Sequence, residues 1–85
     1  AKSAKAARAF AVAADELGGV LAKLERDAEA IELHEQSLAI FAALATQSPG
    51  DASAQRGHAV ACSMLAQARA TAAKRESTPP EVRAA

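Results

Sequence analysis

The sequence predicts an all-α protein: an antiparallel helical hairpin followed by a third packed helix. About a third of the 85 residues are Ala, the strongest intrinsic helix former, while β-branched and aromatic residues are scarce. Apolar residues recur at steps of three and four along three segments, which are separated by short polar or Pro-Gly breaks. The two Phe are the only aromatic residues, so we expect a tightly packed core of Leu, Ile, Val and Ala.

The first helix is expected over residues 2–24. Its larger apolar residues fall on one stripe, which Ala residues at positions 6, 7, 13 and 14 complete: Phe10, Leu17, Val20, Leu21 and Leu24. Gly18 and Gly19 would each weaken the interior of a helix by about 1 kcal/mol relative to Ala. We attribute this pair to the close approach of a second helix, with a local kink as the alternative.

The second helix is expected over residues 28–47, after a polar break at 25–27. Glu29, Glu32 and Glu35 lie in its first turns, near the positive end of the helix dipole. A break this short makes the first two helices antiparallel neighbours. The Ser-Pro-Gly-Asp sequence at 48–51 stops the second helix, and Asp51 or Ser53 caps a third over 52–75. We take residues 1–76 as one three-helix unit and 77–85 as a Pro-containing tail.

Charge and composition narrow the classes of partner. Ten basic and ten acidic residues cancel, which argues against binding to nucleic acid or to an anionic membrane surface. A single Cys excludes an intrachain disulfide and fits a reducing compartment. No apolar run is long enough to span a bilayer, and no signal-peptide pattern opens the chain. We therefore expect a cytoplasmic protein, and the missing initiator Met suggests a processed or excised piece of a larger one.

The first and third helices share a sequence pattern. Residues 8–17, RAFAVAADEL, return loosely as residues 56–65, RGHAVACSML, so a unit of about 48 residues begins to repeat. Together with Leu17-Gly18 and the stretch from Glu29 to Leu38, this pattern resembles the tetratricopeptide repeat family. The match covers about residues 8–70 and is similar to the last one and a half repeats of the long-period arrays in multidomain bacterial proteins. By resemblance, the positions that define the repeat are Leu17, Gly18, Ala30, Ser37, Leu38 and Leu65.

The chain departs from the usual repeat at three positions. Ala14 and His34 stand where aromatic residues are common, and Pro49 closes the second helix about two turns late. The resemblance nevertheless implies a scaffold that binds a peptide or a partner helix on the concave face of a helical-repeat array. The same resemblance places on that face Asp15, Gly19, Ala22, Lys23, Ser63, Gln67, Ala70 and Thr71.

The sequence offers little for catalysis, cofactor binding or metal binding, and we expect none of them. His34-Glu35 begins like a zinc-protease helix, but that chemistry needs a second His where Leu38 stands. His58 and Cys62 lie four residues apart on one helix, which is too few ligands for a closed metal site. We read His34 as a packing position in the second helix and expect His34→Ala to be mild.

Two alternatives to the scaffold remain open. The Glu32 to Glu35 segment resembles the phosphoacceptor box of a histidine-kinase dimerisation hairpin, with His34 accepting phosphate from ATP. A self-associating helical domain is the third hypothesis, because a hairpin plus one helix leaves apolar faces that a second copy could cover.

Overall fold

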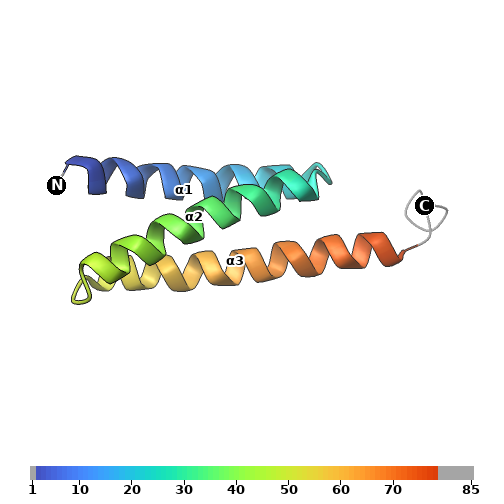
Figure 1. Cartoon of the computed structure of the whole chain (residues 1–85). Coiled ribbons are helices and arrows are strands. Elements are labelled where there is room, and N and C mark those ends of the chain that lie inside the picture. Colours follow the sequence, from blue (N-terminus) through green and yellow to red (C-terminus); the bar gives the residue numbers. More distant parts are fainter. Residues whose placement is uncertain (1, 79–85) are drawn as a thin grey trace.

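The computed structural model describes residues 2–78, which form three α-helices and no strand (Figure 1). These are α1 (Lys2–Lys23), α2 (Asp27–Gln47) and α3 (Ala52–Ser77). α1 and α2 form an antiparallel hairpin, and α3 packs mainly against α2 while it touches α1 only slightly. The all-α prediction is confirmed. The third helix continues two residues past its expected end at Arg75, and residues 79–85 of the predicted tail lie outside the described residues.

The turn between α1 and α2 is a helix cap that uses a non-Gly residue. Glu25 adopts a left-handed φ of 60°. The amide of Arg26 donates to the carbonyl of Leu21 at 2.9 Å, and the amide of Glu25 donates to the carbonyl of Ala22 at 3.0 Å, as in a Schellman motif. A left-handed residue other than Gly costs about 1–2 kcal/mol. These two hydrogen bonds help to offset that cost and turn the chain back within three residues.

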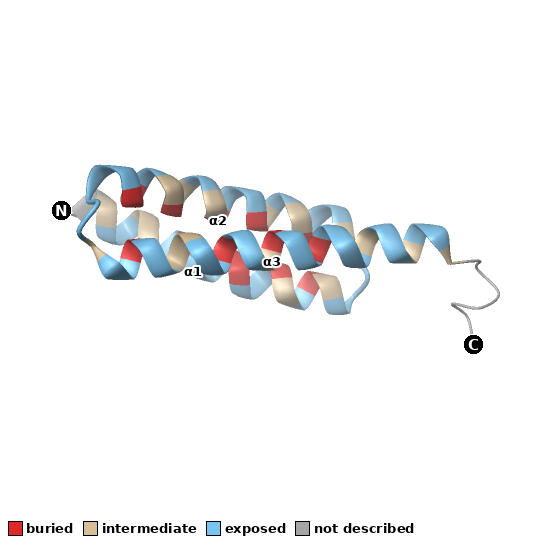
Figure 2. Ribbon diagram, turned by 90° about the horizontal axis from the view of Figure 1, so that it is seen from below, coloured by how far each residue is buried: buried red, intermediate tan, exposed pale blue. Residues whose placement is uncertain are grey.

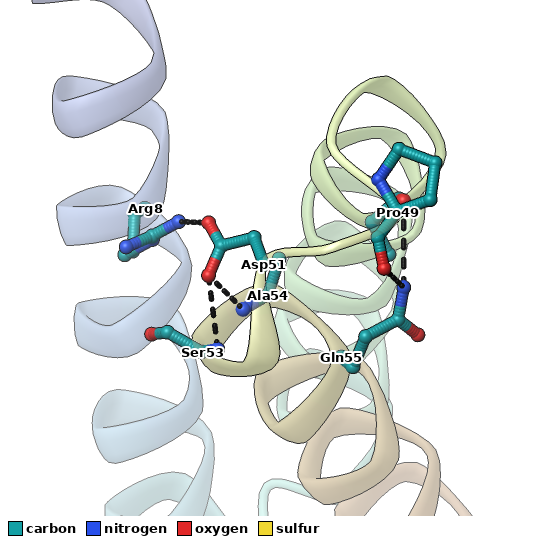
Figure 3. A network of polar contacts seen from close by, with 7 residues as sticks. Arg8, Pro49, Asp51, Ser53, Ala54 and Gln55 are labelled. Carbon is teal, nitrogen blue, oxygen red and sulfur yellow. Dashed lines mark hydrogen bonds and ion pairs between the residues drawn. The ribbon is translucent and has the colours of Figure 1, made fainter.

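Asp51 caps α3, as the sequence indicated. Its Oδ1 accepts hydrogen bonds from the amides of Ser53 at 2.9 Å and Ala54 at 3.2 Å. Figure 3 shows this cap together with Gln55, whose side-chain amide donates to the Pro49 carbonyl at 3.4 Å. Both contacts fix the angle at which α3 leaves the turn.

The core consists mainly of small side chains. Figure 2 shows the buried residues on the faces where the helices meet. Alanine dominates them, as at Ala11, Ala30, Ala54 and Ala61, each fully buried, while Phe41 is the one buried aromatic residue among those described. Small side chains let helix backbones approach closely but bury little apolar area each. The core is therefore tight and thin, as its composition led us to expect.

The expected packing face of the first helix is wrong in one respect. Four of the five larger apolar residues on its stripe are roughly half exposed or more: Phe10 52%, Leu17 51%, Val20 52% and Leu24 61%. α1 instead turns its small residues toward α2, and only Leu21 of the stripe is buried. The physical reason is a polar cluster, described below, that occupies the space between these helices. Within residues 2–78, no helix combines the length and the apolar character needed to cross a membrane.

Candidate functional site

An open groove of about 350 Å³ lies between the N-terminal halves of α1 and α3. Both helices run in the same direction because each is antiparallel to α2. As a result, residues 48 positions apart in the sequence line the two walls. The repeat therefore appears in space as three pairs, namely Arg8 with Arg56, Val12 with Val60, and Glu16 with Met64.

Phe41 of α2 forms the floor of this groove. Its ring is 5% exposed and lies against Gly57 of α3 so closely that a Cβ at Gly57 would overlap it. Gly57 therefore allows α3 to approach α2 at this level. Val12 and Val60 remain about half exposed above the ring, so the floor and the middle of both walls are apolar. Sequence reasoning missed this contact, for which the only local signal was a Gly inside a helix.

An ion pair joins Arg8, at the N-terminal end of the groove, to the Asp51 cap of α3 (Figure 3). Nη2 of Arg8 lies 2.8 Å from Oδ2 of Asp51, and both side chains are about one third exposed. Hydrogen bonding from the Ala54 amide, followed by that from Arg8, holds the pKa of Asp51 below its ordinary value of 3.8. The Nε of Arg8 is buried without a hydrogen-bond partner in the described structure, so Arg8 is oriented by one end of its guanidinium only.

Charges at the groove differ between its two ends. Arg56 makes no ion pair within residues 2–78, and neither does Glu16. Arg56 lies toward the N-terminal end of the groove and Glu16 toward the other end, with the apolar residues between them. The site thus offers an apolar centre flanked by one available cation and one available anion.

A buried polar cluster lies beside the groove, between α1 and α2. Nδ1 of His34 donates to Oδ1 of Asp15 at 2.9 Å, and the hydroxyl of Ser37 donates to Oδ2 at 2.8 Å. His34 is 3% exposed, and Ser37 is fully buried. Gly18 covers the imidazole, because a Cβ there would lie 2.7 Å from its Nε2. The close approach predicted for Gly18 is therefore present, but its neighbour is the His34 ring.

The order of contacts in this cluster does not prepare a nucleophile. A catalytic triad places the His between the Ser and the acid, so that the imidazole takes the hydroxyl proton. Here Asp15 stands in the middle and accepts from both neighbours, and no hydrogen bond joins Ser37 to His34 in the described structure. What the arrangement does is satisfy three buried polar side chains at once.

Of the residues predicted for partner binding, the structure places only Asp15 among those that line the groove. Asp15 borders the groove, yet its carboxylate is buried and held by α2, so the prediction that it is displayed to a partner is wrong. The other five lie outside the residues that line the groove: Gly19, Lys23, Ser63, Gln67 and Thr71. Gly19 has open space beside it, and the rest are exposed. Gly19, Lys23, Gln67 and Thr71 follow the last groove-lining residues of their helices, whereas Ser63 falls between Val60 and Met64 in the sequence.

The predicted repeat positions also fall into two groups. Gly18, Ala30, Ser37 and Leu65 are buried where helices meet, and Leu38 is half-buried. Leu17 differs, because its side chain is half exposed and borders a hollow that Leu33 and Gln36 of α2 also line. It therefore lies at the edge of the hairpin rather than in its core.

His58 and Cys62 are neighbours on α3, with 3.9 Å between Nε2 and Sγ. No third His, Cys, Asp or Glu joins them in a cluster able to hold a metal ion within the described part of the chain.

Comparison of the sequence and structure with models of protein families, with curated proteins and with solved structures found no match.

Proposed function

We propose that this chain is a protein-interaction module that binds a peptide or partner helix in the groove between α1 and α3. The observation that carries the proposal is the apolar centre of the groove. Val12 and Val60 are about half exposed on the two walls of the groove, and Phe41 forms its floor. Exposed apolar groups in a concave site with few polar groups around them are typical of a binding surface.

The charges define the partner further. A segment that fits would place apolar side chains over Val12 and Val60, with an acidic residue near Arg56 and a basic residue near Glu16. Charges at the rim of a binding site affect the orientation of the partner and its association rate more than its affinity. The groove has no Trp or Tyr to act as an anchor, so modest affinity is expected. This agrees with the scaffold implied by the resemblance to tetratricopeptide repeats.

The phosphotransfer alternative receives no support from the position of His34. A phosphoacceptor has to reach ATP held by another domain, whereas this imidazole is covered by Gly18 and bonded to Asp15. Phosphorylation would require α1 and α2 to separate, which would leave the Asp15 carboxylate without its partner. We therefore place function in the groove.

Selection from a random peptide display library tests the proposal. Selected peptides are expected to carry paired apolar residues with an acidic residue on one side. Their affinity, measured by fluorescence anisotropy, is expected to fall at least about tenfold for Val60→Glu. The matched control is Ala59→Glu, which places the same charge on an exposed neighbouring position outside the groove and should leave affinity within about twofold. Peptides that bind both variants equally, or a library that yields no binder, would reject the groove as the site.

A further inference from the structure

The exposed stripe on α1 follows a heptad pattern. Phe10, Leu17 and Leu24 are seven residues apart and occupy the first apolar position, a, of a heptad written abcdefg. Ala13 and Val20 occupy its second apolar position, d. All five are exposed. Leu24 directly follows the last residue of α1, and from Phe10 to Leu24 the stripe covers about 21 Å at 1.5 Å per residue. Apolar residues at these two heptad positions form the seam by which two helices pack in a coiled coil.

The repeat shows that this face is built for helix packing. A shift of 48 residues carries Ala13, Leu17 and Val20 onto Ala61, Leu65 and Ala68 of α3. Those three residues are buried, where α3 packs on α2. The same face of α1 is uncovered and bears larger side chains, with Val20 and Leu24 in place of Ala68 and Ala72. It therefore exposes more apolar surface than the equivalent face that α3 buries.

The charges beside the stripe indicate what covers it. Glu16 and Lys23 occupy the same heptad position, next to the seam on the side away from α2, and neither makes an ion pair within residues 2–78. Suppose that two α1 helices pack antiparallel, with Leu17 level with the partner's Val20. Glu16 of each copy then faces the partner's Lys23, because residues at this heptad position face each other across an antiparallel pair.

The same alignment also matches side-chain sizes. Leu24 lies level with the partner's Ala13, so a large side chain meets a small one, and the two-fold axis repeats both pairings. We propose that α1 is a homodimer interface, in which the exposed stripes of two copies pack antiparallel about a two-fold axis. The groove between α1 and α3 lies on the other flank of α1, and of the residues that line it only Glu16, at its edge, takes part in this dimer.

Sedimentation equilibrium of the whole chain, over a range from about 5 to 500 μM, tests the proposal. A single short helix pair is expected to dimerise with a dissociation constant in the micromolar range. Leu17→Glu buries two charges in the seam and is expected to raise that constant at least about tenfold. Ala59→Glu, on α3, is the control and should leave it unchanged. Circular dichroism of each variant checks that the helices persist.

Charge exchange tests the antiparallel alignment itself. Glu16→Lys places like charges opposite each other twice and is expected to weaken the dimer about three- to tenfold. Combining Glu16→Lys with Lys23→Glu restores opposite charges at both points, so the dissociation constant should return to within about twofold of the starting value. A monomer at every concentration, a dimer insensitive to Leu17→Glu, or a double variant as weak as Glu16→Lys alone would each overturn the proposal.

Discussion

The contact between Gly18 and His34 makes a sharp prediction about two adjacent glycines in one helix. In Gly18→Ala, the new methyl carbon would lie 2.7 Å from Nε2 and 2.8 Å from Cε1 of His34. The imidazole has little freedom to move, because it is buried and bonded to Asp15. In Gly19→Ala, the methyl group meets no atom within 4 Å. The two substitutions are chemically identical and differ only in what surrounds them.

Two terms set the expected free energies of unfolding. Replacing Gly by Ala inside a helix stabilises by about 1 kcal/mol, and both variants gain this term. Overpacking a buried site costs about 1–3 kcal/mol, and only Gly18→Ala meets this cost. We therefore expect Gly19→Ala to be about 1 kcal/mol more stable than the unmodified chain, and Gly18→Ala about 1 kcal/mol less stable. Because the helix-propensity term is common to both, their difference measures the steric cost at Gly18.

Thermal unfolding followed by circular dichroism is sufficient for this measurement. For a domain of this size, a difference of about 2 kcal/mol corresponds to about 8–16 °C in Tm. The comparison should be made at one protein concentration, so that any self-association contributes equally. A combined Gly18→Ala, His34→Ala variant should be more stable than the sum of its single effects, because the methyl group then enters vacated space. Equal stabilisation by the two single alanines would refute the packing described for Gly18.

Three further outcomes follow from the contacts of His34, Gly57 and Asp51. His34→Ala should cost about 2–4 kcal/mol in urea unfolding, which reverses the mild effect suggested by the sequence, because it opens a cavity and removes a hydrogen bond from the buried carboxylate of Asp15. Gly57→Ala should also destabilise in urea unfolding, by about 1 kcal/mol or more despite its better helix propensity, because the methyl group overlaps the Phe41 ring; a gain in stability would contradict that contact. Asp51→Asn should lower Tm near pH 7, and the deficit relative to the unmodified chain should shrink as the pH falls below 3.8 and through the lowered folded-state pKa. A carboxyl whose pKa is lower in the folded state than in the unfolded state stabilises the fold when the pH is above its unfolded-state pKa. Protonation of the folded carboxyl removes that stabilisation. A Tm deficit that stays constant with pH would contradict the assigned shift.

The sequence predicted the elements of this fold well because the signals for them are local. Helix boundaries follow from the Pro-Gly break and from the polar residues at 25–27, and the cap at Asp51 needs only neighbouring amides. The small residue at Gly18 also indicated a close approach correctly. Each of these features depends on residues a few positions apart, which periodicity and capping rules describe directly.

The sequence did not show which side of α1 faces inward. Larger apolar residues normally mark the buried side of a helix, and on α1 they mark an exposed one. The informative signal was a second stripe, in which small residues recur at positions 11, 14 and 18 with Asp15 among them. A single acid on a stripe of small residues indicates a buried partner. Its two partners are on another helix, however, and no local rule pairs Asp15 with His34 and Ser37.

The groove was also beyond local reasoning. Of the residues that the resemblance placed on a binding face, only Asp15 lines this groove. The groove instead forms where Gly57 lets α3 approach Phe41 and where Arg8 reaches Asp51. Both contacts join residues on different helices, so the position of the groove along the helices depends on tertiary packing.

The buried cluster of Asp15, His34 and Ser37 has a consequence for how α1 and α2 find their alignment. Faces composed of alanine are nearly smooth, so sliding one helix along the other by a turn changes their apolar contacts little. The same slide would strip the carboxylate of both donors and leave three polar groups buried without partners, each at a cost of about 1–3 kcal/mol. The cluster therefore selects one alignment among several that alanine alone would leave close in energy, and so supplies specificity where the apolar core supplies mainly attraction.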